Sequence, residues 1–140
     1  MNILKSFINR LLCRKSESVE TRIHDWLNAI DSKENVPSEI TAFNIGIFEQ
    51  EEGYCIYLTG SENYDADDDD WACDADFEPA NKYLALSGTE IKAMEWQEFQ
   101  DMIVRIVSDY LGTSANASTS VFAGRVFTVG FDDGQLVRVK

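Results

Sequence analysis

The sequence predicts an α+β fold, in which an antiparallel sheet of about five strands carries helices on one face. Two observations lead to this prediction. Stretches with helical spacing of apolar residues and stretches with alternating apolar residues follow one another in the order ααβββαββ. The chain has 140 residues, of which 44% are hydrophobic, so residues 1–140 suit a single domain with a sizeable core.

Two helices are predicted near the start of the chain, within residues 1–33. In residues 2–14, apolar positions recur every three or four residues, and Lys and Arg occupy the remaining surface. We expect this basic helix to pack on the chain's own core or on a second copy of the chain, with an anionic membrane surface as the alternative. A second helix is predicted over about 18–32, with Ser16 or Ser18 as its N-cap.

The middle of the chain combines strands with a long helix. Apolar residues alternate imperfectly over 41–49 and return over 54–58, and Glu51-Glu52-Gly53 marks the turn between these two strands. A third short strand is predicted over 82–86. The strongest helical pattern covers residues 91–111, and a glycine follows it directly as a C-cap signal.

The chain is predicted to end in a β-hairpin. Two strands, 124–131 and 135–139, flank the sequence Asp132-Asp133-Gly134. An Asp-Gly pair at such a reversal favours a tight turn, because the turn needs positive φ. A small polar connection over 113–120 joins this hairpin to the long helix.

Acidic residues are concentrated in residues 61–78, which we call the acidic segment. This segment holds nine of the 25 acids and no Lys or Arg, so the other 122 residues carry 16 acids with all 12 bases. The formal net charge of the chain is −13. Such a charge disfavours nucleic acid as a ligand, because phosphates would be repelled, and it favours basic proteins or cations.

The first functional hypothesis is that the acidic segment docks a basic protein. Clustered acids steer a basic partner, and aromatic residues among them are typical of interface anchors. The residues expected to bind the partner are Tyr64, Asp65, Asp67, Asp68, Asp69, Asp70, Trp71, Asp74 and Asp76. Mimicry of a phosphate backbone in the active site of a nuclease is a special case. The alternative is a solvated segment without a ligand, whose aromatic residues pack on the core.

The second functional hypothesis is a calcium site in the same segment. Asp65, Asp67 and Asp69 have the spacing of the first ligands in an EF-hand loop, and Asp76 stands at its last ligand position. The glycine that this loop requires after its third ligand is replaced by Asp70. An EF-hand is therefore disfavoured, and a less regular cation site stays open as an alternative function.

Few residues in the chain suit catalysis, so we expect neither enzyme activity nor a cofactor. His24 is the only histidine, and the sequence contains no P-loop and no GxGxxG motif. Cys13, Cys55 and Cys73 lack CxxC spacing, which suggests free thiols in a reducing compartment. No stretch approaches the ~20 apolar residues of a membrane span or forms the continuous apolar region of a signal peptide, so a cytoplasmic location is expected.

Several segments together resemble small bacterial immunity proteins, which are encoded beside polymorphic or contact-dependent toxins. The resemblance is carried by Tyr64–Glu78, Asn81-Lys82-Tyr83-Leu84, the helix around Trp96 and Phe99, and the ending Val129-Gly130-Phe131-Asp132-Asp133-Gly134. It covers residues 40–140, and the basic first helix has no counterpart in it. It implies a cytoplasmic protein that binds one cognate toxin and blocks the active site or the activation of that toxin.

Overall fold

The computed structural model describes residues 18–113 and 118–140. The helix expected over 2–14 lies outside these ranges, as do Ser16 and Cys13, so those expectations stay predictions. The described elements are, in chain order, α2 (Val19–Lys33), β1 (Ala42–Gln50), β2 (Gly53–Ser61), the 3-10 helix η1 (Asp69–Cys73), β3 (Tyr83–Ser87), α3 (Thr89–Lys92), α4 (Trp96–Thr113), β4 (Val126–Phe131) and β5 (Val137–Arg138). None of the helices in the described ranges combines the length and apolar character that crossing a membrane needs.

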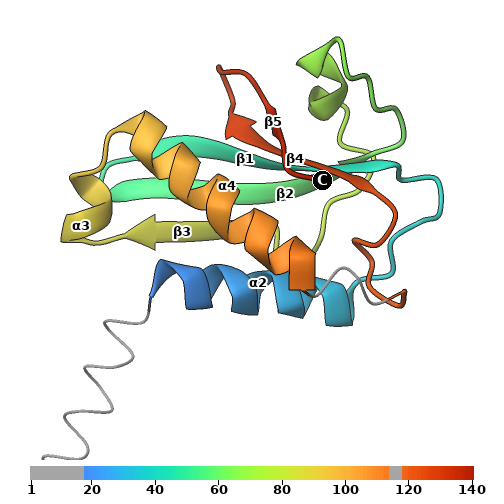
Figure 1. The fold of residues 1–140 in the computed structure, drawn as a ribbon, viewed down its shortest axis with the longest axis horizontal. Helices are drawn as coiled ribbons and strands as arrows, with labels where there is room; N and C mark the ends of the chain where they lie inside the picture. Colours follow the sequence, from blue (N-terminus) through green and yellow to red (C-terminus); the bar gives the residue numbers. More distant parts are fainter. Residues whose placement is uncertain (1–17, 114–117) are drawn as a thin grey trace, which may run out of the picture.

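The five strands form one sheet in the spatial order β3-β2-β1-β4-β5, with β1 at its centre (Figure 1). This arrangement confirms the predicted α+β fold with about five strands. The pairs β1–β2, β2–β3 and β4–β5 are antiparallel. β4, however, runs parallel to β1, with Ala42 opposite Val126 and Ile47 opposite Phe131. The sheet is therefore mixed, and the expectation that it is antiparallel throughout needs this correction.

The parallel pair is a consequence of the long helix α4. β3 runs in the same direction as β1, because both are antiparallel to β2. The 18 residues of α4 then carry the chain back along the sheet by about 27 Å, at about 1.5 Å per residue. β4 therefore starts at the same end of the sheet as β1 and pairs with it in the same direction.

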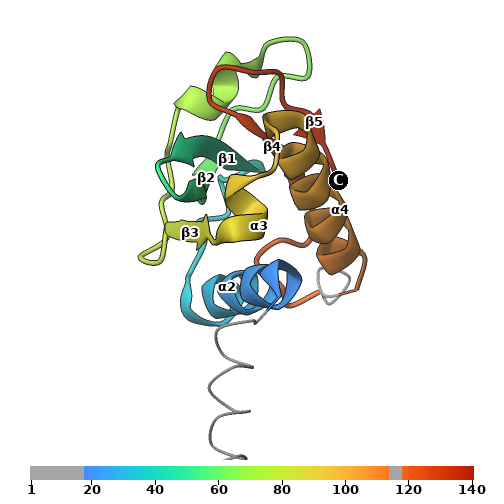
Figure 2. The same ribbon diagram turned by 90° about the vertical axis from the view of Figure 1, so that its left-hand side faces the viewer.

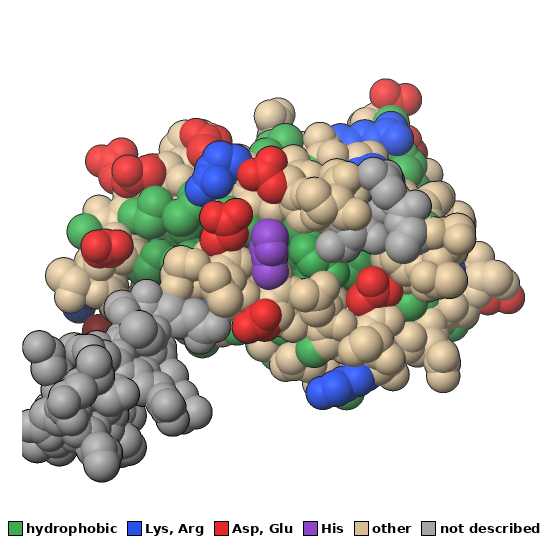
Figure 3. All heavy atoms as spheres, turned by 60° about the horizontal axis from the view of Figure 1, so that its bottom comes forward, with side chains coloured by type: hydrophobic (Ala, Val, Ile, Leu, Met, Phe, Trp, Pro, Cys, Tyr) green, Lys and Arg blue, Asp and Glu red, His purple; other side chains and the backbone are tan. Residues whose placement is uncertain are grey.

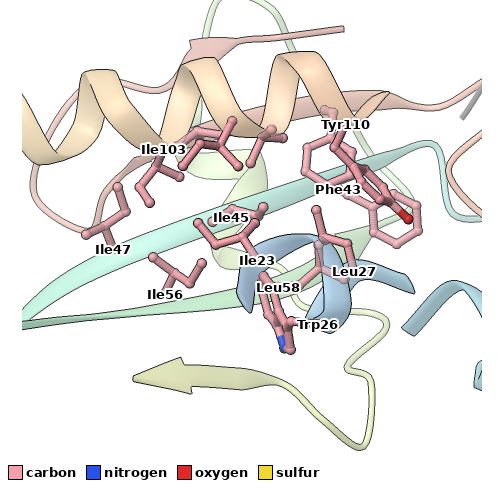
Figure 4. Close-up of a cluster of buried hydrophobic side chains, with 14 of the residues drawn as sticks. Ile23, Trp26, Leu27, Phe43, Ile45, Ile47, Ile56, Leu58, Ile103 and Tyr110 are labelled. Carbon is pink, nitrogen blue, oxygen red and sulfur yellow. The ribbon is translucent and has the colours of Figure 1, made fainter. Parts of the chain in front are cut away.

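α2 and α4 cover the same face of the sheet, as expected (Figure 2). Alternate residues of β1, namely Phe43, Ile45 and Ile47, point toward these helices and are fully buried (Figure 4). The other elements complete the core with Ile23, Leu27, Ile30, Ile56, Leu58, Phe99, Ile103, Ile106, Val107, Phe127 and Val129. The alternating and helical patterns in the sequence thus mark the residues that meet in one core.

α2 begins where the sequence predicts it. The side chain of Ser18 accepts a hydrogen bond from the backbone N–H of Thr21 at 3.1 Å, which satisfies one of the free donors at the helix start. Two long side chains fasten the helix to the sheet. Trp26 Nε1 donates to a backbone carbonyl ahead of β3 at 2.8 Å, and Arg22 donates to the carbonyl of Ala85 in β3 at 2.8 Å. α2 therefore protects part of the exposed edge of the sheet.

The helix predicted over 91–111 is interrupted near its start. Residues 93–95 separate α3 from α4, although the sequence contains no helix breaker there. The hydroxyl group of Tyr54 in β2 donates a hydrogen bond to the backbone carbonyl of Met94 at 2.8 Å. This contact holds the interruption against the sheet, and it is a tertiary interaction that the helical pattern does not report.

The connection between β4 and β5 is wider than the predicted tight turn. It spans residues 132–136, and Gly134 does not have positive φ, so the expected Asp-Gly turn geometry is wrong. The N–H of Gly134 instead donates to the carbonyl of Phe131 at 3.0 Å. The N–H of Leu136 donates to Asp69 of η1 at 3.0 Å. Contact with η1 therefore stabilises a longer connection.

The second face of the sheet, opposite the helices, is organised around Tyr57. Tyr57 pairs with Gly46 across β1 and β2, and Gly46 pairs with Gly130 across β1 and β4. A Cβ atom at Gly46 would overlap the ring of Tyr57. The missing side chain therefore lets the ring lie across β1, and the Tyr57 hydroxyl donates a hydrogen bond to Asp132.

We expect Gly46→Ala to lower the free energy of unfolding by about 1–3 kcal/mol, because the added methyl group overpacks against Tyr57. Backbone strain does not contribute, since Gly46 lacks positive φ. Tyr57→Ala removes the ring, and in that background the same glycine substitution should cost less than about 1 kcal/mol. Urea denaturation of the four proteins measures this coupling. Equal costs in both backgrounds would contradict the proposed contact.

Candidate functional site

The acidic segment leaves β2 and returns to it as a closed loop. An isolated bridge joins Gly60 to Phe77, and the N–H of Gly60 donates to the carbonyl of Phe77 at 2.9 Å. Between these points, η1 lies beside the β4–β5 connection in both ribbon views, and on the side of the sheet opposite α4 (Figure 2). The segment therefore covers part of the second face of the sheet.

Two aromatic residues pack the acidic segment on its own chain. Trp71 of η1 is only 6% exposed. Tyr64 is half-buried, with its ring centre 5.1 Å from that of Trp71, and the guanidinium of Arg138 lies 5.7 Å from the Tyr64 ring centre. Trp71 thus offers little surface in this structure, and its ring holds the segment on the rest of the chain, as in the alternative in which the aromatic residues pack on the core. Its role as a partner anchor stays a prediction.

The carboxylates of the segment accept hydrogen bonds from backbone N–H groups. Asp65 and Asp68 each accept from the N–H two residues later, at 2.9 and 3.0 Å, as is common in turns. Asp76 accepts from the N–H of Glu62 at 2.9 Å, and Asp69 accepts from the β4–β5 connection at 3.0 Å. These bonds order the segment without neutralising its charge.

The negative charge of the segment is exposed and largely unpaired. Its nine acidic residues are all exposed. Within the described ranges, one ion pair involves the segment, between Glu78 and Lys82 at 2.9 Å. On the face around α2, by contrast, acidic side chains are scattered among basic, polar and apolar ones (Figure 3). The acidic segment is therefore a concentrated source of negative potential with a defined shape.

A hollow of about 250 Å³ lies between the acidic segment and the sheet. Its lining includes Asn44, Tyr57, Asp69, Asp70, Cys73 and Asp132. Burial, followed by the hydrogen bond to Asp132, raises the pKa of Tyr57 far above its ordinary value. Tyr57 is therefore a neutral hydrogen-bond donor to Asp132 near pH 7.

The structure does not bring together the four aspartates of the calcium hypothesis. Among the described residues, no group of three or more His, Cys, Asp or Glu side chains is placed to hold a metal ion. Asp65, Asp69 and Asp76 each accept from a different backbone N–H, and Asp69 begins η1. The sequence spacing of an EF-hand is present, but the loop that would aim these residues and Asp67 at one point is absent from this part of the chain.

His24 and the two described cysteines do not form a catalytic arrangement with the acidic segment. His24 belongs to α2, where its ring lies 5.3 Å from that of Tyr110. Its Nε2 atom is buried and has no hydrogen-bond partner among the described residues. Cys55 is buried in β2 and Cys73 is exposed in η1, and both are free thiols as expected.

Acidic residues outside the segment lie next to it on the surface, which the sequence did not predict. Asp132 and Asp133 of the β4–β5 connection are exposed beside η1. Glu49 and Trp96 line a neighbouring hollow together with Asp133. Asp132-Asp133-Gly134 is visible in the sequence, yet it predicts only a turn, because its approach to η1 depends on the pairing of β4 with β1. We call the acidic segment together with Asp132 and Asp133 the acidic surface.

We expect calcium to give no stoichiometric heat when it is titrated into the purified protein in a calorimeter. The physical reason is that the carboxylates of the acidic segment do not converge on one point. Asp69→Asn serves as the matched control, because it removes one proposed ligand. A saturable one-to-one heat that disappears in Asp69→Asn would establish a cation site.

The raised pKa of Tyr57 predicts a loss of stability at alkaline pH. A group whose pKa is higher in the folded chain stabilises the fold fully below its unfolded pKa of about 10, and this contribution is lost as the pH rises above that value. Urea denaturation between about pH 9 and pH 11 should show falling stability, and Tyr57→Phe should make the fall shallower. The pKa values of Tyr54 and Cys55 are also raised, so part of the fall persists. Identical slopes in both proteins would contradict this assignment.

The acidic surface is thus the candidate functional site of this chain. It combines exposed carboxylates, an ordered backbone and a neutral tyrosine, and the described residues contain no group of side chains that could hold a metal ion. Comparison of the chain with protein-family models, with characterised proteins and with solved structures gives no match.

Proposed function

We propose that this chain is a binding protein that docks a basic protein partner on its acidic surface. We propose further that it is an immunity protein, which neutralises a cognate toxin in the cytoplasm and has no enzyme activity of its own. The docking role is supported by the geometry of the acidic surface. The immunity role is supported by the resemblance of residues 40–140 to such proteins in size, acidity and sequence.

The observation that carries this proposal is the ordered, exposed and unpaired charge of the acidic segment. A solvated segment that binds nothing does not need a buried tryptophan, nor four hydrogen bonds from backbone N–H groups to its aspartate side chains. Here Trp71 and these bonds hold like charges together, although two such charges 4 Å apart repel by about 1 kcal/mol in bulk water. A cationic partner relieves this repulsion when it binds.

The order of the segment also favours fast and tight binding. A negative surface raises the local concentration of a basic partner and increases its association rate. Because the backbone of the segment is held by its own hydrogen bonds, little conformational entropy is lost on binding. Electrostatic steering and preorganisation together are what an inhibitor of a basic enzyme needs.

The rival functions have less support from the described residues. A calcium-binding domain needs converging oxygen ligands, and no three carboxylates of the described residues are placed to hold a metal ion. An enzyme needs a nucleophile or acid–base pair in a shaped site, whereas His24 and Cys73 belong to different layers of the fold. An adaptor without a toxin partner would share the docking surface and differ only in what the partner does.

The first candidates for the partner are proteins encoded by the reading frames next to the gene of this chain. Replacing the four aspartates 67–70 by asparagine should slow association with that partner about 10-fold at low ionic strength, because steering weakens. The difference should disappear near 1 M salt, where the Debye length is about 3 Å. Stopped-flow measurements over a salt series test this expectation. Protection of cells that express the partner separates an immunity protein from an adaptor.

A matched control changes the net charge equally on another part of the molecule. Four exposed acids on α2 and α4 suit this purpose, namely Glu20, Asp25, Asp101 and Asp109. Their replacement by Gln and Asn should slow association much less, because it leaves the acidic surface intact. Equal effects of the two variants would assign binding to net charge alone. Unchanged kinetics for the 67–70 variant would exclude the docking role of the segment.

A further inference from the structure

Trp96 is an exposed tryptophan that the docking of a basic partner on the acidic segment does not explain. It is the first residue of α4 and is 54% exposed, whereas Trp26 and Trp71 are buried. A large aromatic ring left in water is unfavourable for the free protein, and tryptophan is enriched among the residues that dominate binding energy at interfaces. Trp96 is therefore a candidate contact residue.

Trp96 lies between two hollows on the surface. The larger has a volume of about 570 Å³, and its lining includes Glu49 and Glu95. The smaller has a volume of about 300 Å³, and its lining includes Glu49, Phe131 and Asp133. Glu49, Glu95 and Asp133 are exposed and form no ion pair with a described Lys or Arg. The Trp96 ring is thus bordered by three carboxylates that have no described cationic partner.

Packing fixes the position of the Trp96 ring without covering it. The ring meets Phe131 at a centroid distance of 5.9 Å and an interplanar angle of 90°. Phe131 in turn contacts Tyr54 at 5.9 Å, and the Tyr54 hydroxyl holds the carbonyl of Met94, two residues before Trp96. A ring held in this way presents a defined surface at little cost in conformational entropy.

No cation from the part of the chain that the structure describes stacks on the Trp96 ring. Among the described residues, cation–π contacts involve the rings of Phe43, Tyr57, Tyr64 and Tyr83, and none involves Trp96. Lys92 lines the larger hollow, but its ammonium group pairs with Glu52 at 3.9 Å. A positively charged group from another molecule therefore complements the Trp96 ring and the carboxylates beside it.

We propose that the smaller hollow at Trp96 binds an arginine side chain of the basic partner, a proposal that rests on the docking function above. The guanidinium group stacks on the Trp96 ring and donates hydrogen bonds to the carboxylates of Glu49 and Asp133. Arginine suits this site better than lysine, because its planar group both stacks on aromatic faces and donates to carboxylates through several N–H groups. A second copy of the chain is a poor occupant, since two chains of net charge −13 repel.

The β4–β5 connection joins the Trp96 hollow to the acidic surface. Phe131 and Gly134 line both the smaller Trp96 hollow and the hollow beneath the acidic segment. The two sites are therefore neighbours, and one partner reaches both. The acidic segment attracts the partner over a distance, and the Trp96 hollow selects for an arginine at one position.

The test titrates ¹⁵N-labelled protein with an acetylated and amidated peptide of four arginines, and separately with peptides of four lysines or four citrullines. Each tryptophan gives its own indole N–H signal, and the signal of Trp96 is assigned by its loss in Trp96→Ala. The arginine peptide should shift the Trp96 signal in a saturable way and leave that of Trp26, which donates to Asn81, unchanged. The citrulline peptide, which has no charge, should cause no shift.

Substitutions measure the contribution of the ring. Trp96→Ala should weaken binding of the arginine peptide about 3- to 30-fold, and should weaken binding of the lysine peptide less. Tyr83→Ala is the matched control, because Tyr83 is also 54% exposed but has Lys82 5.1 Å from its ring centre. This control variant should bind the arginine peptide as tightly as the parent protein. Both positions are exposed, and backbone amide spectra verify that each variant is folded.

The arginine site is excluded if Trp96→Ala binds the arginine peptide as tightly as the parent, or if Tyr83→Ala loses as much affinity. The asparagine variant of residues 67–70 distinguishes this failure from failure of the proposed function. If that variant slows association with the partner while Trp96→Ala has no effect on the peptide, the docking function stands and the arginine site falls. If Trp96→Ala weakens binding of the arginine peptide while the 67–70 variant associates with the partner as fast as the parent does, the arginine site stands and the docking role of the acidic segment falls.

Discussion

The central strand β1 has to be covered on both of its faces, and the rest of the structure follows from this constraint. Its first six residues are buried, and β2 and β4 pair along its two edges. Phe43, Ile45 and Ile47 meet the helices on one face. On the other face, the hydroxyl of Thr128 donates to the side chain of Asn44 at 2.8 Å, because a buried polar group needs a partner. Tyr57 and the acidic segment complete this second layer.

Two opposing physical effects act on the acidic segment. Like charges in a short span repel, which favours an open and solvated loop. The burial of Trp71 and the hydrogen bonds from backbone N–H groups to Asp65, Asp68 and Asp76 act in the other direction. The carboxylates remain in water, so they are not desolvated, while the backbone beneath them is ordered. This is how a strongly charged segment becomes part of the fold without neutralising its charge.

The proposed binding surface divides its tasks between two neighbouring sites. Exposed aspartates act over several ångströms and discriminate little among basic partners, since the interaction depends on charge and distance. An aromatic ring acts at contact and depends on the shape and orientation of the group that covers it. Steering by the acidic segment and recognition at Trp96 are therefore complementary, and the β4–β5 connection that lines both hollows places them side by side.

The sequence by itself determined the elements and the concentration of charge, because both depend on residues that are close along the chain. The N-cap at Ser18, the alternating core residues of β1 and the acids of 61–78 are all local patterns. Only the tertiary structure decided that β4 runs parallel to β1, that Tyr54 holds the break between α3 and α4 at Met94, and that the acidic segment lies beside Asp132. It also decided that Trp71 is buried while Trp96 is exposed, although the two residues have the same side chain. Burial depends on which layer lies above a residue, and that layer is formed by segments distant in sequence, whose approach no local pattern encodes.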